Sequence, residues 1–328
     1  MTGFRLLNEF QRAFPLCERP FLEIATRLAC SEERVLQMLQ EFVEQGAVSR
    51  VGAVFAPRTI GAGALVALQV PPEQLERVAA LVSNHPAVNH NYERENRFNL
   101  WFVATAPDDD ALRQAVQEIE SASGCGPALV LSLLDEYRID LGFDLSDAEP
   151  AVAIDFARQS PPRIALDPTQ QRLVAALQDG LPLAPRPYLA LGKQAGLTEG
   201  ATLALLQRWI EQGVIRRFGV IVRHRELGYH ANAMVVWDVP DALVSAAGLR
   251  LAQQAGVNLC YRRERALPDW PFNLYCMLHG RSRDAVLQQI AALQEDCRLA
   301  PFDSRVLFSR RRFKQQGARY VQREAAHG

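Results

Sequence analysis

The amino-acid sequence predicts an α+β fold built by internal duplication, with two homologous halves in one chain. The first observation is a repeated pair of segments: Phe14 to Phe21 recurs as Leu181 to Tyr188, and Glu44 to Gly52 recurs as Glu211 to Gly219. Both segments recur after the same 167 positions, from residue 14 to 181 and from 44 to 211. The second observation is that helical spacing of apolar residues gives way to strand alternation in both halves.

Each half opens with two helical patterns and then a short apolar alternation. Ser31 is placed to cap the second helix of the first half and Gly46 to end it, and Thr198 and Gly213 hold the same positions in the second half. Helix, turn, helix and strand in this order are typical of a winged helix-turn-helix. The predicted boundaries of the two units are 1–60 and 168–228.

Each half then continues with alternating strand and helix patterns in the order β-α-β-β-α-β, which is the ferredoxin-like arrangement. In the first half these elements are Leu65 to Val70, Pro72 to Ser83, Val88 to Arg94, Asn99 to Ala104, Asp109 to Ser121 and Ala128 to Leu134. In the second half they are Ala233 to Val239, Ala242 to Gln254, Val257 to Arg263, Asn273 to His279, Asp284 to Asp296 and Asp303 to Phe308. The predicted domains are 61–143 and 229–328, with a proline-containing linker at 144–167.

Composition excludes several classes of protein. The 328 residues carry a formal net charge of −1, which gives no general attraction to nucleic acid. No run of 18 apolar residues exists and the first residues lack a secretory pattern, so we expect a cytoplasmic protein without membrane spans. The six cysteines are irregularly spaced, which favours free thiols.

The strand pattern brings chemically active side chains to one face of the predicted sheet. Alternation places Val88, His90, Tyr92 and Arg94 on a shared face, and Tyr261 and Arg263 repeat the last pair in the second half. On the following strands the shared faces carry two further sets, Asn99 with Trp101 and Asn273 with Tyr275 and His279. Each half therefore has one strand histidine, at different places, which indicates two non-equivalent sites or one site assembled from both halves.

The motifs resemble those of a known family. The overall layout is similar to the Lrp/AsnC transcription regulators, and the run His90 to Glu95 with Asn99 to Phe102 is similar to the signature strands of the siroheme decarboxylases. So are Arg216 to Tyr229, Cys260 to Arg263 and Trp270 to Leu274. The two-copy chain resembles the fused D–L type of heme d1 biosynthesis. The resemblance implies loss of two acetate carboxyls from siroheme as CO₂, which leaves 12,18-didecarboxysiroheme.

The resemblance and the chemistry together suggest roles for individual residues. Decarboxylation needs a held carboxylate, an electron sink and a proton donor, and the macrocycle supplies the sink, so no cofactor of the protein's own is expected. The expected catalytic residues are His90, Tyr92, Arg94 and His279. The expected substrate-binding residues are Asn99, Trp101, Arg216, Arg217, Arg223, Tyr261, Arg262, Arg263, Asn273 and Tyr275. No intrinsic metal site is expected, and either histidine is an alternative ligand for the siroheme iron.

Two other functions stay open. A transcription regulator would need basic residues at the start of each second helix, but these helices begin Ser31-Glu32-Glu33 and Thr198-Glu199-Gly200. We therefore expect no specific DNA partner, although the basic stretch from Arg216 to Arg225 argues the other way. A tetrapyrrole carrier without turnover is the third possibility. We expect siroheme as the ligand, an internal pseudo-dimer, and further decarboxylase subunits as possible partners.

Overall fold

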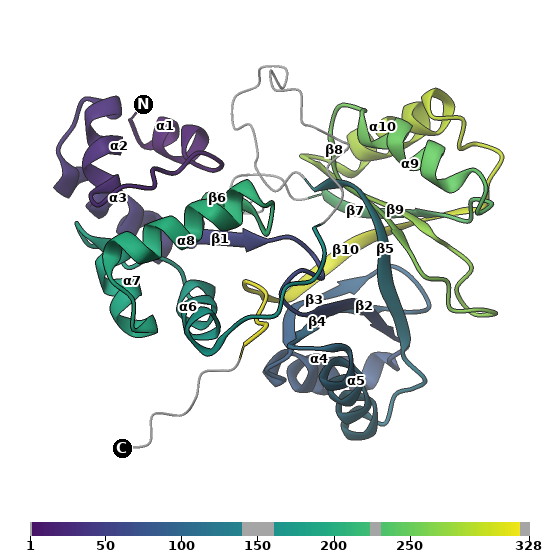
Figure 1. The fold of residues 1–328 in the computed structure, drawn as a ribbon. Coiled ribbons are helices and arrows are strands. Elements are labelled where there is room, and N and C mark those ends of the chain that lie inside the picture. The colour runs from purple at the N-terminus through teal and green to yellow at the C-terminus, as the bar shows by residue number, and fades with distance from the viewer. Residues whose placement is uncertain (1, 140–160, 224–230, 322–328) are drawn as a thin grey trace.

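The computed structural model describes residues 2–139, 161–223 and 231–321. Helix-turn-helix elements of both halves lie together on one side of the molecule, and an eight-stranded barrel lies on the other (Figure 1). No helix among these residues is both long and apolar enough to cross a bilayer. All six cysteines are free thiols, which confirms the prediction from their spacing.

Each half begins with three helices, one more than the sequence predicted. The additional helices, α1 and α6, precede the predicted pairs in both halves. In the first half the helices are α1 (Thr2–Glu9), α2 (Pro20–Leu28) and α3 (Glu32–Glu44), and in the second half α6 (Pro168–Gln178), α7 (Pro187–Ala195) and α8 (Glu199–Glu211). The predicted caps are present: the side chains of Ser31 and Thr198 accept hydrogen bonds from the backbone N–H groups of Arg34 and Ala201.

The strands after these helices pair with each other instead of forming a separate wing in each half. Strand β1 (Val48–Phe55) runs antiparallel to β6 (Ile215–Val222), with Gly52 opposite Gly219. The other edge of β6 is bridged by the chain after α1, because the N–H of Val220 donates to the carbonyl of Phe10 at 2.8 Å. The strands predicted as wings therefore form one shared ribbon, and the end of the second predicted unit, at residue 228, lies outside the described residues.

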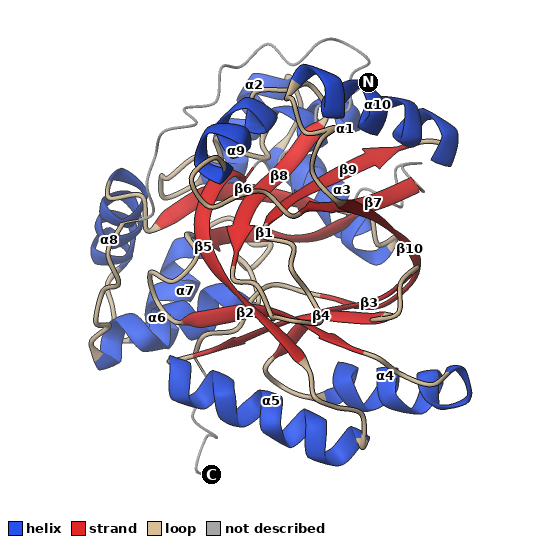
Figure 2. Ribbon diagram, turned by 90° about the vertical axis from the view of Figure 1, so that its right-hand side faces the viewer, coloured by secondary structure: helices blue, strands red, loops and turns tan. Residues whose placement is uncertain are grey.

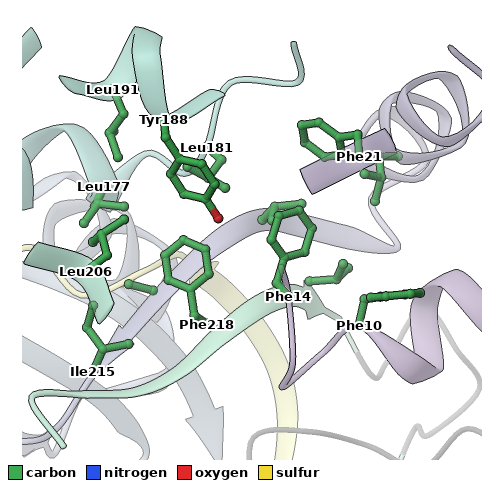
Figure 3. Packing of buried hydrophobic residues seen from close by; sticks show 14 of the residues in the cluster. Phe10, Phe14, Phe21, Leu177, Leu181, Tyr188, Leu191, Leu206, Ile215 and Phe218 are labelled. Atoms are coloured by element: carbon green, nitrogen blue, oxygen red, sulfur yellow. The ribbon is translucent and has the colours of Figure 1, made fainter. Parts of the chain in front are cut away.

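One hydrophobic core joins the two helix-turn-helix units (Figure 3). Phe14 from the first half packs against Phe218 from the second, with ring centroids 6.2 Å apart. The buried hydroxyl of Tyr188 donates a 2.8 Å hydrogen bond to the carbonyl of Pro15. Since these contacts cross between the halves, the helical units support each other and hold the β1–β6 ribbon in place.

The barrel is made from both halves. The first half supplies β2 (Ala62–Leu68), η1 (Pro72–Gln74), α4 (Leu75–Asn84), β3 (Val88–Arg94), β4 (Leu100–Ala106), α5 (Asp109–Ser123) and β5 (Leu129–Ile139). The second half supplies β7 (Ala231–Trp237), α9 (Val244–Ala252), β8 (Val257–Arg263), β9 (Leu274–Gly280), α10 (Arg283–Asp296) and β10 (Ser304–Gln315). The strands close in the order β10-β3-β4-β2-β5-β8-β9-β7, and the helices cover the outside (Figure 2).

The last strand of each half is longer than predicted and crosses to the other half. Strand β5 pairs with β2 and then with β8, and β10 pairs with β7 and then with β3. The two crossings have the same register, because Leu133 lies opposite Arg263 and Ser309 lies opposite Arg94. The predicted ends at Leu134 and Phe308 miss these crossings, where the sequence becomes too polar for a strand pattern.

Gly248 in α9 marks a tight contact between the halves. A β-carbon at this position would lie 2.1 Å from the ring of Tyr137 on β5. We predict that Gly248→Ala lowers the free energy of unfolding by about 1–3 kcal/mol, as overpacking does in other cores. The midpoint of denaturant unfolding measures this change.

The matched control for this substitution is Gly200→Ala in α8. No atom lies within 4 Å of a β-carbon built there. Its alanine variant should therefore be as stable as the parent or slightly more stable, because alanine favours the helix. Equal midpoints for the two variants would contradict the proposed contact.

Candidate active site

A cavity of about 460 Å³ lies between the β1–β6 ribbon and the interior of the barrel. Strands of both halves line it, and so does the segment 315–318, which begins at the last residue of β10. Hydrogen bonds hold the chain here: the N–H of Gln316 donates to the carbonyl of Asn89 on β3, and the N–H of Tyr320, two residues beyond the segment, donates to Oε1 of Gln178 on α6. The cavity is thus enclosed by elements that are distant in sequence.

Two equivalent β-bulges shape the cavity wall. Pairing shifts between Val88 and His90 on β3, and between Val257 and Leu259 on β8. Both valines consequently pack outward among buried apolar residues, whereas alternation placed Val88 on the face that it shares with His90. The bulged residues, Asn89 and Asn258, line the cavity instead. The inward placement of His90, Tyr92, Arg94, Tyr261 and Arg263 agrees with the alternation.

The cavity lining carries a concentrated positive charge in a chain that is nearly neutral overall. Among the described residues that line it there are eight arginines and no aspartate or glutamate. The arginines are Arg50, Arg58, Arg94, Arg216, Arg217, Arg223, Arg263 and Arg312. Acidic side chains outside the lining approach this set: Glu136 lies 3.4 Å from Arg216, and the charge of Asp179 acts on Arg50. A cavity lined in this way suits a ligand with several carboxylates, since guanidinium pairs with carboxylate in a planar, two-bond geometry.

Arg94 and Arg263 occupy equivalent positions, and each is held by the opposite half. Arg94 on β3 donates to the carbonyl of Leu307 on β10 at 3.1 Å, and Arg263 on β8 donates to the carbonyl of Leu131 on β5 at 3.0 Å. Each guanidinium also lies over a tyrosine ring, Tyr92 and Tyr261 respectively. Burial lowers the pKa of Arg94 to about 10 and also lowers the pKa of Arg263. Both cations are therefore poorly solvated and would gain from binding an anion.

The two histidines line the same cavity but differ in their surroundings. His279 lies between two asparagine side chains: its Nε2 is 2.9 Å from Nδ2 of Asn232 and its Nδ1 is 3.0 Å from Oδ1 of Asn258. His90 lies near the ring of Tyr92, with centroids 6.3 Å apart, and interacts with the backbone of Gln316. Burial lowers the pKa of each imidazole to about 4. Nearby cations add to the effect, Arg50 for His90 and Arg94 for His279.

These pKa values correct one premise of the sequence analysis. A histidine that titrates near neutral pH would donate a proton directly, but both imidazoles are neutral at pH 7 in the unliganded protein. The physical reason is desolvation within the barrel, which disfavours the charged form.

Aromatic side chains fill the barrel next to the cavity. Trp101 and Tyr275 line the cavity and belong to a buried cluster with Trp270 and Phe272. Their polar atoms have partners in the protein: Trp101 Nε1 donates to the carbonyl of Phe98 at 2.6 Å, and Tyr275 receives a hydrogen bond from Trp270 Nε1 at 2.7 Å. The cavity therefore has a rigid aromatic wall beside its arginines.

Three predicted substrate-binding residues lie elsewhere. Asn99 and Asn273 each clamp a strand end: their side chains bond both backbone groups of Val70 and Val239, respectively, at 2.9–3.0 Å. Arg262 points outward to ion pairs with Asp135 and Asp241. Asn99 and Asn273 lie just before β4 and β9. Arg262 lies on the face of β8 opposite to that of Tyr261 and Arg263. None of the three therefore lines the cavity.

Sequence reasoning also missed residues that do line the cavity. Arg50 is the counterpart of Arg217 in the repeat, so the duplication itself could have identified it. Arg312 lies in the extended part of β10, opposite Tyr92, where no strand was predicted. The positions of three asparagine side chains depend on the bulges and on contacts between strands, which alternation within one sequence does not predict. They are Asn232, Asn258 and Asn89.

Two protein-family models match this chain. The model of the AsnC-like ligand binding domain matches residues 60–138 and 226–314, so each half of the barrel is an AsnC-like domain. The model of the siroheme decarboxylase NirDL-like HTH domain matches residues 4–48 and 170–216. The chain belongs to the siroheme decarboxylase family, as the relatives below show.

The matches extend over nearly the whole chain. The siroheme decarboxylase NirDL subunit of Paracoccus denitrificans is 44% identical over 317 residues, which cover 96% of this chain and 95% of that protein. The siroheme decarboxylase NirL subunit of Stutzerimonas stutzeri is 51% identical over 154 residues, 46% of this chain and 91% of the subunit. A crystal structure of the siroheme decarboxylase NirDL in complex with an iron-uroporphyrin III analogue has a TM-score of 0.69 at 27% identity and covers 97% of this chain and 93% of that one.

The buried histidines should make the unliganded protein sensitive to acid. The unfolded chain takes up a proton on each histidine near pH 6.5, but the folded protein does so only near pH 4. The free energy of unfolding therefore decreases as the pH falls from 6.5 to 4, by roughly 1–3 kcal/mol for each imidazole. Melting temperatures measured across this range should fall less steeply for His90→Gln and His279→Gln than for the parent.

His85 provides the control, because it lies outside the cavity, half-buried beside Glu118. The variant His85→Gln should keep the parent's steep decline. A slope that none of the three substitutions changes would show that other groups cause the acid sensitivity.

Proposed function

We propose that this protein is a siroheme decarboxylase that converts siroheme to 12,18-didecarboxysiroheme with release of two CO₂, in heme d1 biosynthesis. The cavity is the observation that supports the proposal. Eight arginines line it beside an aromatic wall, and no aspartate or glutamate is among its described lining residues. Siroheme combines eight carboxylates with a flat, apolar ring. Membership in the siroheme decarboxylase family supports the same assignment.

In the proposed mechanism, arginines hold the substrate by its carboxylates. Arg94 and Arg263 are the best placed, since each is fixed by a backbone carbonyl of the opposite half and is poorly solvated. An acetate held in this buried setting is partly desolvated, which favours loss of CO₂. The electrons left on the substrate carbon are taken up by the conjugated macrocycle, so the protein needs no cofactor of its own.

The new methyl group needs a proton, and the proposal assigns its delivery to the histidines with Tyr92 as a positioning group. Both imidazoles are neutral before substrate binds. An anionic acetate beside an imidazole raises its pKa, because an opposite charge favours the protonated form. Substrate binding would therefore prepare the proton donor. Neutral imidazole is also the form that binds a metal, so coordination of the substrate's iron by His90 or His279 is the alternative role.

The finer architecture belongs to the same proposal. We regard the chain as a fused pair of winged helix-turn-helix and ferredoxin-like units that acts as an internal pseudo-dimer in the cytoplasm. Two crossings, β5 with β8 and β10 with β3, support this interpretation. Further siroheme decarboxylase subunits are possible partners, because one relative is a single NirL subunit of about half the length.

Transcription regulation and tetrapyrrole carriage are the competing functions. In its first turn α3 carries Glu32 and Glu33 with one basic residue, Arg34, and α8 carries Glu199 and no basic residue. This charge is unfavourable for contact with DNA phosphates. Arg216, Arg217 and Arg223 line the cavity, so the basic stretch that favoured DNA binding has another use. Salt-resistant binding to one DNA fragment would support regulation.

The decisive experiment is anaerobic incubation of the purified protein with siroheme, followed by mass analysis of the tetrapyrrole. We expect a product that has lost two CO₂. Tight binding with unchanged siroheme would support the carrier and overturn the enzyme assignment.

Lysine substitution tests the role of the two symmetric arginines. A lysine keeps one positive charge but loses the planar fork, and the burial that lowers the pKa of Arg94 to about 10 would bring a lysine closer to neutrality. We predict that Arg94→Lys lowers kcat/KM by roughly 10–100-fold, the loss of one or two charge-assisted hydrogen bonds. Arg263→Lys should have the milder effect, since Arg94 lies beside His279.

The control is Arg262→Lys, because Arg262 points away from the cavity to Asp135 and Asp241. Steady-state kinetics on the three variants measure the differences. Unchanged kinetics for both Arg94→Lys and Arg263→Lys would exclude these side chains as carboxylate ligands.

A further inference from the structure

We propose that Asn232 and Asn258 are positioning residues that hold His279 as the neutral tautomer with its proton on Nδ1, so that the basic Nε2 lies on the side of Arg94. The inference rests on the proposed function only for its effect on turnover, because the tautomer is a property of the unliganded protein. It concerns side chains that sequence analysis did not identify.

The four side chains form a continuous chain of hydrogen bonds across the two halves. Nη1 of Arg94 lies 3.4 Å from Oδ1 of Asn232, whose Nδ2 lies 2.9 Å from Nε2 of His279. On the other side of the ring, Nδ1 of His279 lies 3.0 Å from Oδ1 of Asn258. Arg94 belongs to the first half, and the other three residues belong to the second.

Donor and acceptor roles along this chain follow from Arg94. A guanidinium only donates, so Asn232 accepts with Oδ1 and turns its NH₂ group toward the histidine. Nε2 of His279 must then accept that hydrogen bond, which leaves the proton on Nδ1. Asn258 accepts from this Nδ1–H with its own oxygen. One obligate donor thus orients two amides and selects one tautomer of the imidazole.

The equivalent positions of the first half show that this arrangement is not required by the fold. Gly63 stands where the second half has Asn232, and Thr105 stands where it has His279, because both pairs occupy the same register on their strands. Asn89 is the counterpart of Asn258 and donates to the hydroxyl of Thr105 at 3.0 Å. The barrel therefore closes with glycine and threonine at these places, so the Asn232–His279 contact serves something other than folding.

The chemical consequence concerns the site where His279 presents its lone pair. With Nδ1 protonated, the basic nitrogen is Nε2, on the side of Asn232 and Arg94. A carboxylate bound by Arg94 would be on this side of the ring. Protonation of His279 beside that carboxylate would therefore occur at Nε2, and it would displace the NH₂ group of Asn232 from this nitrogen.

Nitrogen NMR of ¹⁵N-histidine-labelled, ligand-free protein tests the proposal at neutral pH. The chain has six histidines, and the variant His279→Gln identifies the resonances of His279 by their disappearance. We expect a proton-bearing Nδ1 and a proton-free Nε2. Asn258→Leu removes the acceptor and should weaken the preference for this tautomer, since only the donor Asn232 then favours it, whereas Asn258→Asp keeps an acceptor and should retain the preference.

Two further variants complete the test. Asn232→Gly copies the residue of the first half and should also weaken the preference, because the amide of Asn258 is then free to flip, and the double variant Asn232→Gly/Asn258→Leu should abolish it. Asn89→Leu alters the equivalent bulge of the other half and should leave the His279 resonances unchanged. If the double variant Asn232→Gly/Asn258→Leu folds and keeps the Nδ1–H tautomer, or if the parent has its proton on Nε2, the proposal is wrong.

Turnover separates this proposal from the proposed function. For an active enzyme we expect Asn258→Leu to lower kcat at least tenfold with little change in KM, and Asn258→Asp to recover most of the loss. A parent that shows the expected tautomer but does not decarboxylate siroheme would refute the enzyme assignment and leave the positioning role intact. Equal kcat for Asn258→Leu and the parent would refute the positioning role in catalysis.

Discussion

The crossing of β5 and β10 between the halves is the constraint on which the site depends. Each crossing continues a strand beyond its own sheet and pairs it with a strand of the other half, so the eight strands close without an edge. The carbonyls that hold Arg94 and Arg263 belong to these crossing strands. If the halves separated, both guanidiniums would lose their fixed partners, and the cavity would lose half of its wall.

Closure also explains how the protein tolerates so much positive charge around one cavity. Moving a cation out of water costs several kcal/mol, and two of the eight arginines that share the cavity, Arg94 and Arg217, are buried. Part of this cost is offset by backbone carbonyls, by tyrosine faces and by the ion pair between Arg216 and Glu136. Apolar packing elsewhere offsets the rest of this free-energy cost. It includes the hydrophobic core shared by the helical units and the clusters between the barrel strands and their covering helices. The site is thus poised to gain free energy when a polyanion enters.

Much of the site could be predicted because strand alternation and duplication are both visible in the sequence. His90, Tyr92 and Arg94 lie two residues apart on one strand, and their inward orientation follows from that spacing. Asn99 and Asn273 show the limit of the same reasoning, because a polar residue just before a strand serves equally well as a backbone clamp. The extensions of β5 and β10 were missed since their polar residues pair with another half of the molecule, which no local pattern records. The pKa values of the histidines depend on enclosure, a property of the whole barrel.

The strand order of the barrel has a consequence for folding during synthesis on the ribosome. Strand β3 is complete long before β10, its neighbour in the barrel, since more than two hundred residues separate Arg94 from Ser309. During this interval β3 exposes an unpaired edge, which is a template for aggregation. Charged and polar side chains along it, among them Glu93 and Arg94, make that edge a poor partner for other chains. The polar side chains of β3 thus also make this edge of the nascent chain less prone to aggregation.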